Sequence, residues 1–71
     1  MQPGDNVFYI LRKGTGFPRE TYIPARIKSY SDKTKMFVII LSKGGKEVNK
    51  NAIPERNLSY KNHNGEFNRG I

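Results

Sequence analysis

Residues 22–48 decide the fold, and their sequence is YIPARIKSYSDKTKMFVIILSKGGKEV. Apolar and polar residues alternate over residues 22–30, which is the period of a half-buried β-strand. Residues 36–41 form the most apolar run of the chain and predict the central strand of a sheet. The Gly44-Gly45 pair supplies the positive φ angles of a tight hairpin, after which a short polar strand returns. This stretch therefore predicts three antiparallel strands.

Two further strands are expected outside this stretch. Residues 7–11 are rich in β-branched and aromatic types and follow a turn cluster, so they predict an opening strand. Two glycines and a proline interrupt residues 13–21, which predicts a long loop. Residues 52–54 suit one turn of 3₁₀ helix, and residues 58–60 suit a last short strand. The sequence thus predicts five strands in all.

The alternation in the second of these strands predicts the role of each of its faces. The core face holds Ile23, Ala25 and Ile27, and the exposed face holds Tyr22, Pro24, Arg26 and Lys28. Because proline has no backbone N–H to donate, Pro24 indicates that this strand lies at a sheet edge or is bulged there. The exposed face combines an aromatic ring with cations, which makes it a candidate binding surface.

The chain has no sustained 3.6-residue apolar repeat, so no long helix is expected. A single antiparallel sheet without a covering helix would expose one apolar side. We therefore expect an all-β fold in which five short antiparallel strands close into a small barrel over residues 1–60. Residues 61–71 contain too few apolar side chains to pack, so this C-terminal tail is expected to be flexible.

Length and composition exclude several classes of protein. The chain has 71 residues, no cysteine and 35% hydrophobic residues, which allows one domain with a small core. A cavity that closes around a substrate would consume most of that core, so an enzyme is not expected. The lack of cysteine excludes disulfides and thiolate zinc sites and fits a reducing, intracellular compartment. No apolar run approaches the roughly 18 residues of a membrane span, and no export signal is recognisable.

The charge of the chain is strongly positive, with 13 Lys and Arg against 6 Asp and Glu and a net charge of +7. Residues 12–35 carry +5 of this, because seven basic residues there are offset only by Glu20 and Asp32. Such a surface favours polyanions such as nucleic acid or an acidic protein segment.

Residues for catalysis or metal binding are scarce. The one histidine, His63, lies in the tail, and the six acidic residues are spread singly along the chain. General acid–base catalysis needs converging groups, which this spacing does not suggest. The sequence therefore predicts no catalytic residue, no metal site and no cofactor.

Aromatic and cationic residues are interleaved in the basic part of the chain. An aromatic ring can stack on a base while a neighbouring cation contacts the phosphate. The candidate nucleic-acid-binding residues are Arg12, Lys13, Arg19, Tyr22, Arg26 and Lys28. The candidate contacts for a peptide or a methylated cation are Phe17, Tyr22 and Tyr30. As structural alternatives, Phe17 could plug one end of the barrel and Tyr22 could cover the rim of the core.

The order of motifs over residues 4–60 resembles the Tudor family of chromatin-associated domains. The matching motifs are Gly4-Asp5-x-Val7, Tyr22-x-x-Ala25-x-Ile27, Val38-x-Ile40, Gly44-Gly45-Lys46-Glu47-x-Val48 and Ile53. The resemblance implies a five-stranded SH3-like barrel with an aromatic cage for methylated lysine or arginine. The cage positions of the family correspond here to Leu11, Tyr22, Ile40 and Lys43, of which only Tyr22 is aromatic.

A second resemblance is to the C-terminal domain of retroviral and retrotransposon integrases. In that family a Pro-Arg pair leads to an aromatic, a small, a basic and an aliphatic residue. The corresponding residues here are Pro18-Arg19, Tyr22, Ala25, Arg26 and Ile27, followed by a turn and residues 38–48. The resemblance implies the same barrel type and DNA binding through basic residues.

The strand count and both resemblances converge on a five-stranded antiparallel SH3-like (Tudor-like) barrel. We expect a non-enzymatic module, nuclear and associated with chromatin or nucleic acid, that binds DNA or RNA through its first loop and second strand. The alternative is a reader of an acidic peptide or of a histone tail, in which Tyr22 contacts a methylated lysine or arginine, or a protein assembly module. Neither function involves a membrane.

Overall fold

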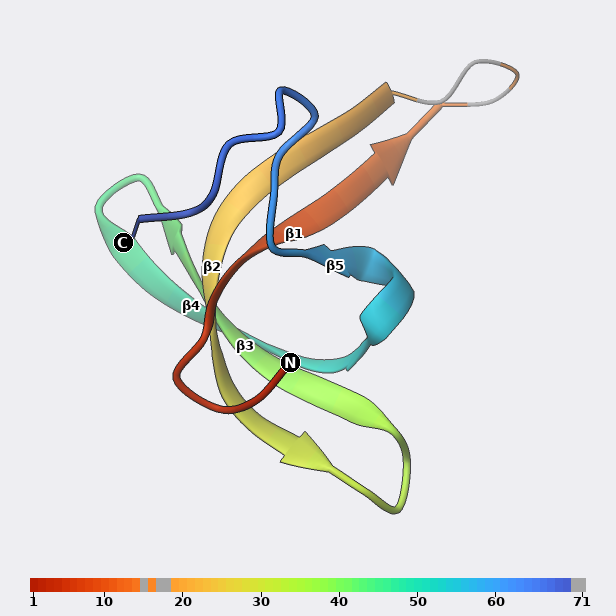
Figure 1. Cartoon of the computed structure of the whole chain (residues 1–71), viewed down its shortest axis with the longest axis vertical. Helices are drawn as coiled ribbons and strands as arrows, with labels where there is room; N and C mark the ends of the chain where they lie inside the picture. The colour runs from red at the N-terminus through yellow and green to blue at the C-terminus, as the bar shows by residue number, and fades with distance from the viewer. Residues whose placement is uncertain (15, 17–18, 70–71) are drawn as a thin grey trace.

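The structure, a computed structural model, describes residues 1–14, 16 and 19–69. Its elements are β1 (Asn6–Lys13), β2 (Arg19–Ser31), β3 (Met36–Lys43), β4 (Lys46–Pro54), the 3₁₀ helix η1 (Glu55–Asn57) and β5 (Leu58–Ser59) (Figure 1). All neighbouring strands pair antiparallel, in the order β4-β3-β2-β1-β5. The expected all-β fold of five antiparallel strands is confirmed.

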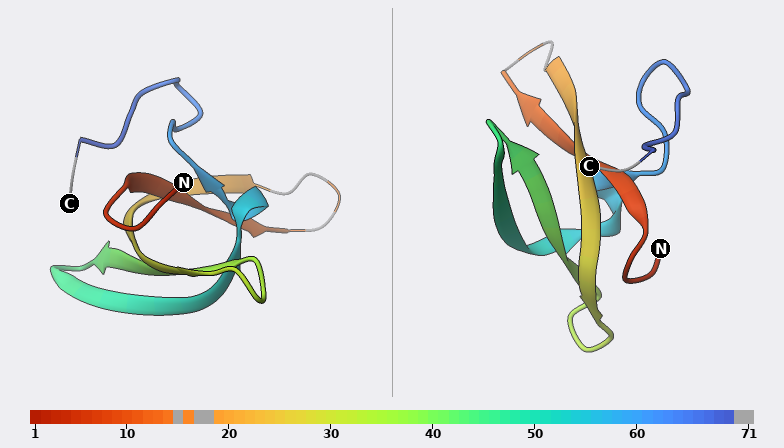
Figure 2. Two further views of the ribbon diagram at one scale, coloured as in Figure 1. Left: turned by 60° about the horizontal axis from the view of Figure 1, so that its bottom comes forward. Right: turned by 90° about the vertical axis from the view of Figure 1, so that its left-hand side faces the viewer.

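The sheet curls over its concave side but does not close into a barrel, so that part of the expectation is wrong (Figure 2). β5 has two residues and pairs with β1. Among the described residues no ladder joins β5 to β4, so the outer edge of β4 stays unpaired. A closed barrel was expected because closure would cover the apolar side of the sheet. The curl of the sheet covers this side although the barrel does not close.

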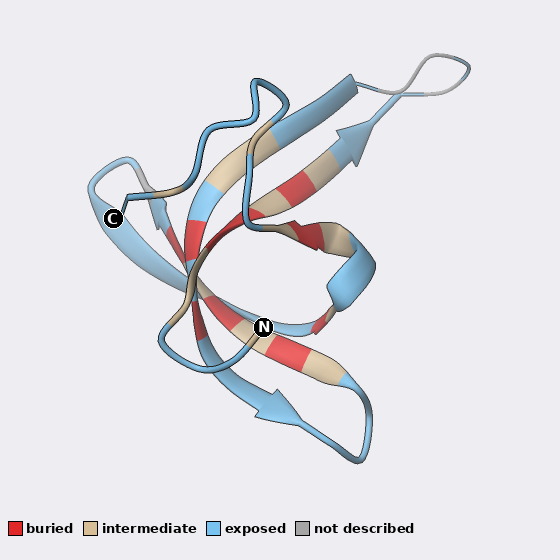
Figure 3. Cartoon of the chain, in the orientation of Figure 1, coloured by how far each residue is buried: buried red, intermediate tan, exposed pale blue. Residues whose placement is uncertain are grey.

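The concave side of the sheet carries the hydrophobic core (Figure 3). The buried cluster consists of Val7, Ala25, Ile27, Phe37, Ile39, Leu41, Ile53 and Leu58. Ala25 and Ile27 are at most 1% exposed, and Ile23 packs against the cluster partly buried. The predicted core face of the second strand is therefore confirmed.

The first hairpin is longer than its sequence suggested. Arg12 is the register partner of Glu20, and Lys13 is the partner of Arg19. Residues 13, 19 and 20 of these pairs were expected to belong to the loop. Cross-strand pairing therefore extends into the expected loop and ends next to its first glycine. The second hairpin agrees with expectation: Gly44 and Gly45 have φ angles of 59° and 78°.

The return strand β4 is also longer than expected. It runs through residues 52–54, where the sequence suggested a 3₁₀ turn, and the turn follows it at Glu55–Asn57. Ala52 has a φ of 57°, next to a register irregularity between β3 and β4. A bulge therefore bends the strand where a helical turn was expected.

Pro24 lies in the middle strand of the sheet and not at an edge. It is the register partner of Phe8 on β1, whereas the ladder between β2 and β3 ends at Ala25. From Pro24 to the tip, the β1–β2 hairpin continues without β3 beside it. Pro24, which has no backbone N–H to donate, therefore lies where the β1–β2 and β3–β4 hairpins separate. β3, predicted to be central, is second from the edge.

The C-terminal segment 61–69 follows a defined path across the convex side of β1 and β2. The Asn68 Nδ2 donates hydrogen bonds to the backbone oxygens of Val7, at 2.7 Å, and Ala25, at 3.0 Å. Phe8 and Ile10 are 7% and 8% exposed, although they lie outside the concave core cluster. The flexibility expected for residues 61–71 stays a prediction.

Candidate functional site

Three of the predicted binding residues, Arg12, Tyr22 and Arg26, lie on the convex face of the sheet. The Arg12 guanidinium is already engaged there. Its Nη1 donates to the Asn57 Oδ1 at 2.8 Å, and its Nε lies 3.7 Å from the Glu20 Oε1. Both partners of this ion pair are more than two-fifths exposed, so the pair contributes little stability. It does, however, offset the charge that Arg12 offers to a ligand.

Tyr22 is half-buried on the convex face, opposite the concave core cluster. Its ring packs edge-on against Phe8 with centroids 6.4 Å apart, and it lies 5.8 Å from the His63 ring. Its hydroxyl donates to the Glu20 Oε2 at 3.0 Å. This hydrogen bond to a carboxylate is the main reason why the pKa of Tyr22 is raised above 10.0. The ring is therefore engaged with side chains of its own chain on the convex side.

Lys13 and Arg19 belong to the opposite, concave face. Side chains alternate along a strand, and directly paired residues share a face. Arg12 and Glu20 are convex, so their neighbours Lys13 and Arg19 are concave. The predicted cluster is therefore divided between the two sides of the sheet, with Arg26 left exposed on the convex side.

A bulge separates the predicted aromatic contacts. The register between β2 and β3 shifts between Ile27 and Ser29, which leaves Lys28 as the extra, exposed residue. The shift turns Tyr30 to the face of its partner Phe37, and the two ring centroids are 4.6 Å apart. Tyr22 and Tyr30 thus lie on opposite faces and do not form one cage. Phe17 lies outside the described residues.

A groove on the concave face brings together residues that the sequence did not identify as one binding site. It has a volume of about 230 Å³ and is lined by Tyr9, Leu11, Ile23, Leu41, Val48 and Lys50. All six belong to the concave side by register. The groove opens where the two hairpins separate beyond Pro24, because no strand fills the space between them.

The cations around this groove are not balanced by acids on the same face. The concave strand positions at this end hold Lys13, Arg19, Lys46 and Lys50. Among the described strands, no Asp or Glu occupies a concave position: Glu20 and Glu47 are convex by register, and the other acids precede, follow or connect the strands. The concave face therefore has an apolar floor and a positive rim.

The floor of the groove contains an aromatic ring beside a cation. The Lys50 Nζ lies 5.4 Å from the centroid of the Tyr9 ring. The pattern Lys46-x-Val48-x-Lys50 was visible in the sequence as an alternation of cation and apolar residue. The sequence did not show that Lys50 lies near Tyr9, because this contact depends on how the curled sheet brings β4 opposite β1.

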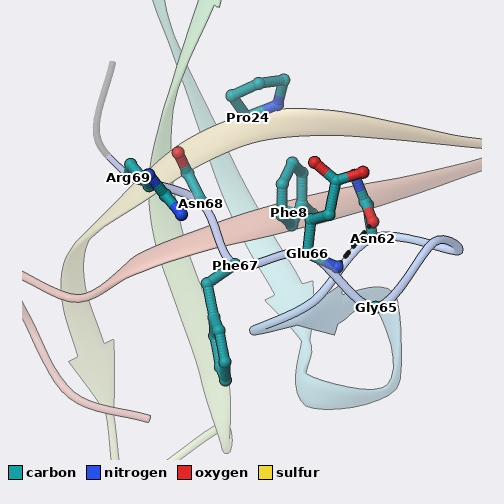
Figure 4. Close-up of a pocket in the computed structure, with 8 residues that line it drawn as sticks. All are labelled: Phe8, Pro24, Asn62, Gly65, Glu66, Phe67, Asn68 and Arg69. Atoms are coloured by element: carbon teal, nitrogen blue, oxygen red, sulfur yellow. Dashed lines mark hydrogen bonds between the residues drawn. The ribbon is translucent and has the colours of Figure 1, made fainter.

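A larger hollow, of about 450 Å³, lies on the convex side between the sheet and segment 61–69 (Figure 4). Phe8 and Pro24 form its floor, while Glu66 and Arg69 bring one charge of each sign. Phe67 points away from Phe8, with the Lys61 Nζ 4.9 Å from its ring centroid. The hollow has no excess of one charge, so it is a weaker site for an anion than the concave groove.

Within the described part of the chain, no three His, Asp or Glu side chains are grouped to hold a metal ion, and no helix is long and apolar enough to cross a membrane. No protein-family model, curated protein or solved structure matches the chain. The Tudor and integrase resemblances remain predictions.

Proposed function

We propose that this chain is a non-enzymatic nucleic-acid-binding module whose contact surface is the concave groove and its basic rim. The observation that carries the proposal is the segregation of charge. Lys13, Arg19, Lys46 and Lys50 share the concave face, whereas the convex face mixes Arg12 and Arg26 with acids. Cations without local counter-charges attract phosphates and release the condensed counterions of a nucleic acid.

The same face is a poor receptor for a methylated cation. Lysines surround the groove, and the Lys50 ammonium already lies over its aromatic ring. A methylated lysine or arginine would meet repulsion and would have to displace this ammonium. An anionic ligand has the opposite relation to the rim, since it would be attracted to all four cations.

Two double variants with equal net charge test where the nucleic acid binds. Lys46→Glu with Lys50→Glu reverses two concave cations, and Arg26→Glu with Lys28→Glu reverses two exposed residues elsewhere on the sheet. We expect the concave variant to weaken binding to DNA and RNA oligonucleotides by about tenfold or more at low salt, and the other variant to weaken it less. Fluorescence anisotropy across a salt series measures both effects.

The slope of affinity against salt is the internal control. The wild-type affinity should fall as salt rises, and the concave variant should show a shallower slope. A wild-type protein that binds no nucleic acid at low salt refutes the proposal. Equal losses in the two variants would show that net charge alone attracts the ligand and that the concave face has no special role.

A further inference from the structure

The floor of the concave groove combines an aromatic ring and aliphatic side chains with a cation. Tyr9 is half-buried, and its ring lies among the aliphatic side chains of Leu11, Ile23 and Val48. The face of this ring is covered by the Lys50 ammonium, which ends a flexible side chain on an exposed strand. A group that takes the place of the ammonium would have an aromatic surface beneath it and apolar walls around it.

We propose that this groove accepts an unpaired base, so that the nucleic acid it recognises is single-stranded. The inference rests on the proposed function, because it names which form of nucleic acid fits the same site. A duplex keeps its bases paired and stacked and presents phosphates at its surface, so it has no base to insert into an apolar groove. An unpaired base has a free π face, and stacking on an aromatic side chain is worth about 1–3 kcal/mol per base.

The cations are placed to hold the backbone on both sides of the inserted base. Lys46 and Lys50 lie on one strand, four residues apart on the same face, which is about 13 Å along β4. Lys13 and Arg19 are paired on the concave face of the other hairpin, next along their strands from the groove-lining side of β1 and β2. When the base stacks on Tyr9, the Lys50 side chain swings from the ring to a neighbouring phosphate. One residue therefore exchanges a cation–π contact for an ion pair.

The aromatic and apolar floor of the groove favours a nucleic acid over the other anionic polymer, an acidic peptide. Asp and Glu side chains satisfy the rim but leave the ring and the apolar walls exposed. A nucleotide satisfies both, since its phosphate is anionic and its base is flat and aromatic. The acidic peptide is therefore a competing outcome of the test below.

An abasic oligonucleotide separates the base from the phosphate. Thymidine and abasic oligonucleotides of equal length, about twelve nucleotides, carry the same charge and differ only in the bases. We expect the wild-type protein to bind the thymidine oligonucleotide roughly five- to a hundredfold more tightly than the abasic one. Tyr9→Leu should abolish most of this preference while retaining salt-dependent binding, and Tyr9→Phe, which keeps the ring, should retain the preference.

Each outcome bears on one of the two proposals. If the wild-type protein binds both oligonucleotides equally and with the same salt dependence, the base inference is wrong and the proposed function stands. The same holds if duplex DNA binds more tightly than the thymidine oligonucleotide. If polyglutamate of equal charge competes equally well, both proposals are wrong, because the face then binds any polyanion. If neither oligonucleotide binds, both proposals fail. The wild-type comparison needs no mutation, and thermal melts check that the Tyr9 variants are folded.

Discussion

At the scale of single residues, the Asp5 carboxylate joins the N-terminal turn to the residue that follows β5. It accepts hydrogen bonds from the Tyr60 hydroxyl, at 2.8 Å, and from the Gln2 backbone N–H, at 3.0 Å. The Tyr60 bond is the main cause that lowers the pKa of Asp5 below 3.8, and the Gln2 bond lowers this pKa further. The bond to Asp5 raises the pKa of Tyr60 above 10.0.

These two shifts set a pH window for the contact. The Asp5 contribution to stability is complete above pH 3.8 and is lost as the pH falls through the lowered pKa of the folded state. The Tyr60 contribution is complete below pH 10.0 and is lost as the pH rises through its raised pKa. We expect Tyr60→Phe to move the pKa of Asp5 back toward 3.8, as measured by NMR titration of the carboxyl carbon. Tyr30→Phe is the control, and an Asp5 pKa unchanged by Tyr60→Phe would contradict the assignment.

At the scale of elements, one side chain of segment 61–69 hydrogen-bonds two strands of the sheet. The Asn68 amide bridges the backbone oxygens of Val7 and Ala25, two residues with 0% exposure on neighbouring strands. Asn68→Ala leaves these acceptors without that donor, which should destabilise the fold by about 1–3 kcal/mol in urea unfolding. Asn64→Ala, an exposed change in the same segment, should have little effect. Equal stabilities of the two variants would show that the segment is not anchored through Asn68.

The sequence predicted the strands better than it predicted their pairing. Alternation placed Ala25 and Ile27 in the core, and the Gly44-Gly45 pair fixed a hairpin, because both signals are local. The bulge at Lys28 left no local signal, and it turns Tyr30 away from the face of Tyr22. Local patterns thus predict elements, whereas register decides which side chains meet.

The proposed binding site was also predicted only in part, because its arrangement depends on strand pairing. Lys13 and Arg19 were identified from charge, but their separation from Arg12 and Tyr22 follows from the strand pairing. Lys50 and the ring of Tyr9 lie on β4 and β1, which meet only through the curl of the sheet.

The C-terminal tail, residues 61–71, was expected to be flexible because it is polar. The Asn68 side chain of this segment donates hydrogen bonds to Val7 and Ala25, and an argument from apolar content does not detect such polar contacts.

At the scale of the whole molecule, an open sheet explains both the small core and the groove. The radius of gyration is 12.0 Å, against about 11 Å for a compact chain of this length. The difference fits a β1–β2 hairpin that extends beyond the body of the sheet (Figure 1). Closure would place a strand along the free edge of β4. The open form instead leaves an apolar strip bordered by cations.

The most direct test of this account is an NMR titration of the labelled protein with a single-stranded thymidine oligonucleotide. We predict that the largest shifts fall on the concave face, at the amides and side chains of Tyr9, Leu11, Ile23, Val48 and Lys50. Arg26 and the convex segment 61–69 should shift little. Shifts centred on Arg26 and Lys28, or no shifts at low salt, would contradict the claim that the concave groove is the nucleic-acid-binding surface.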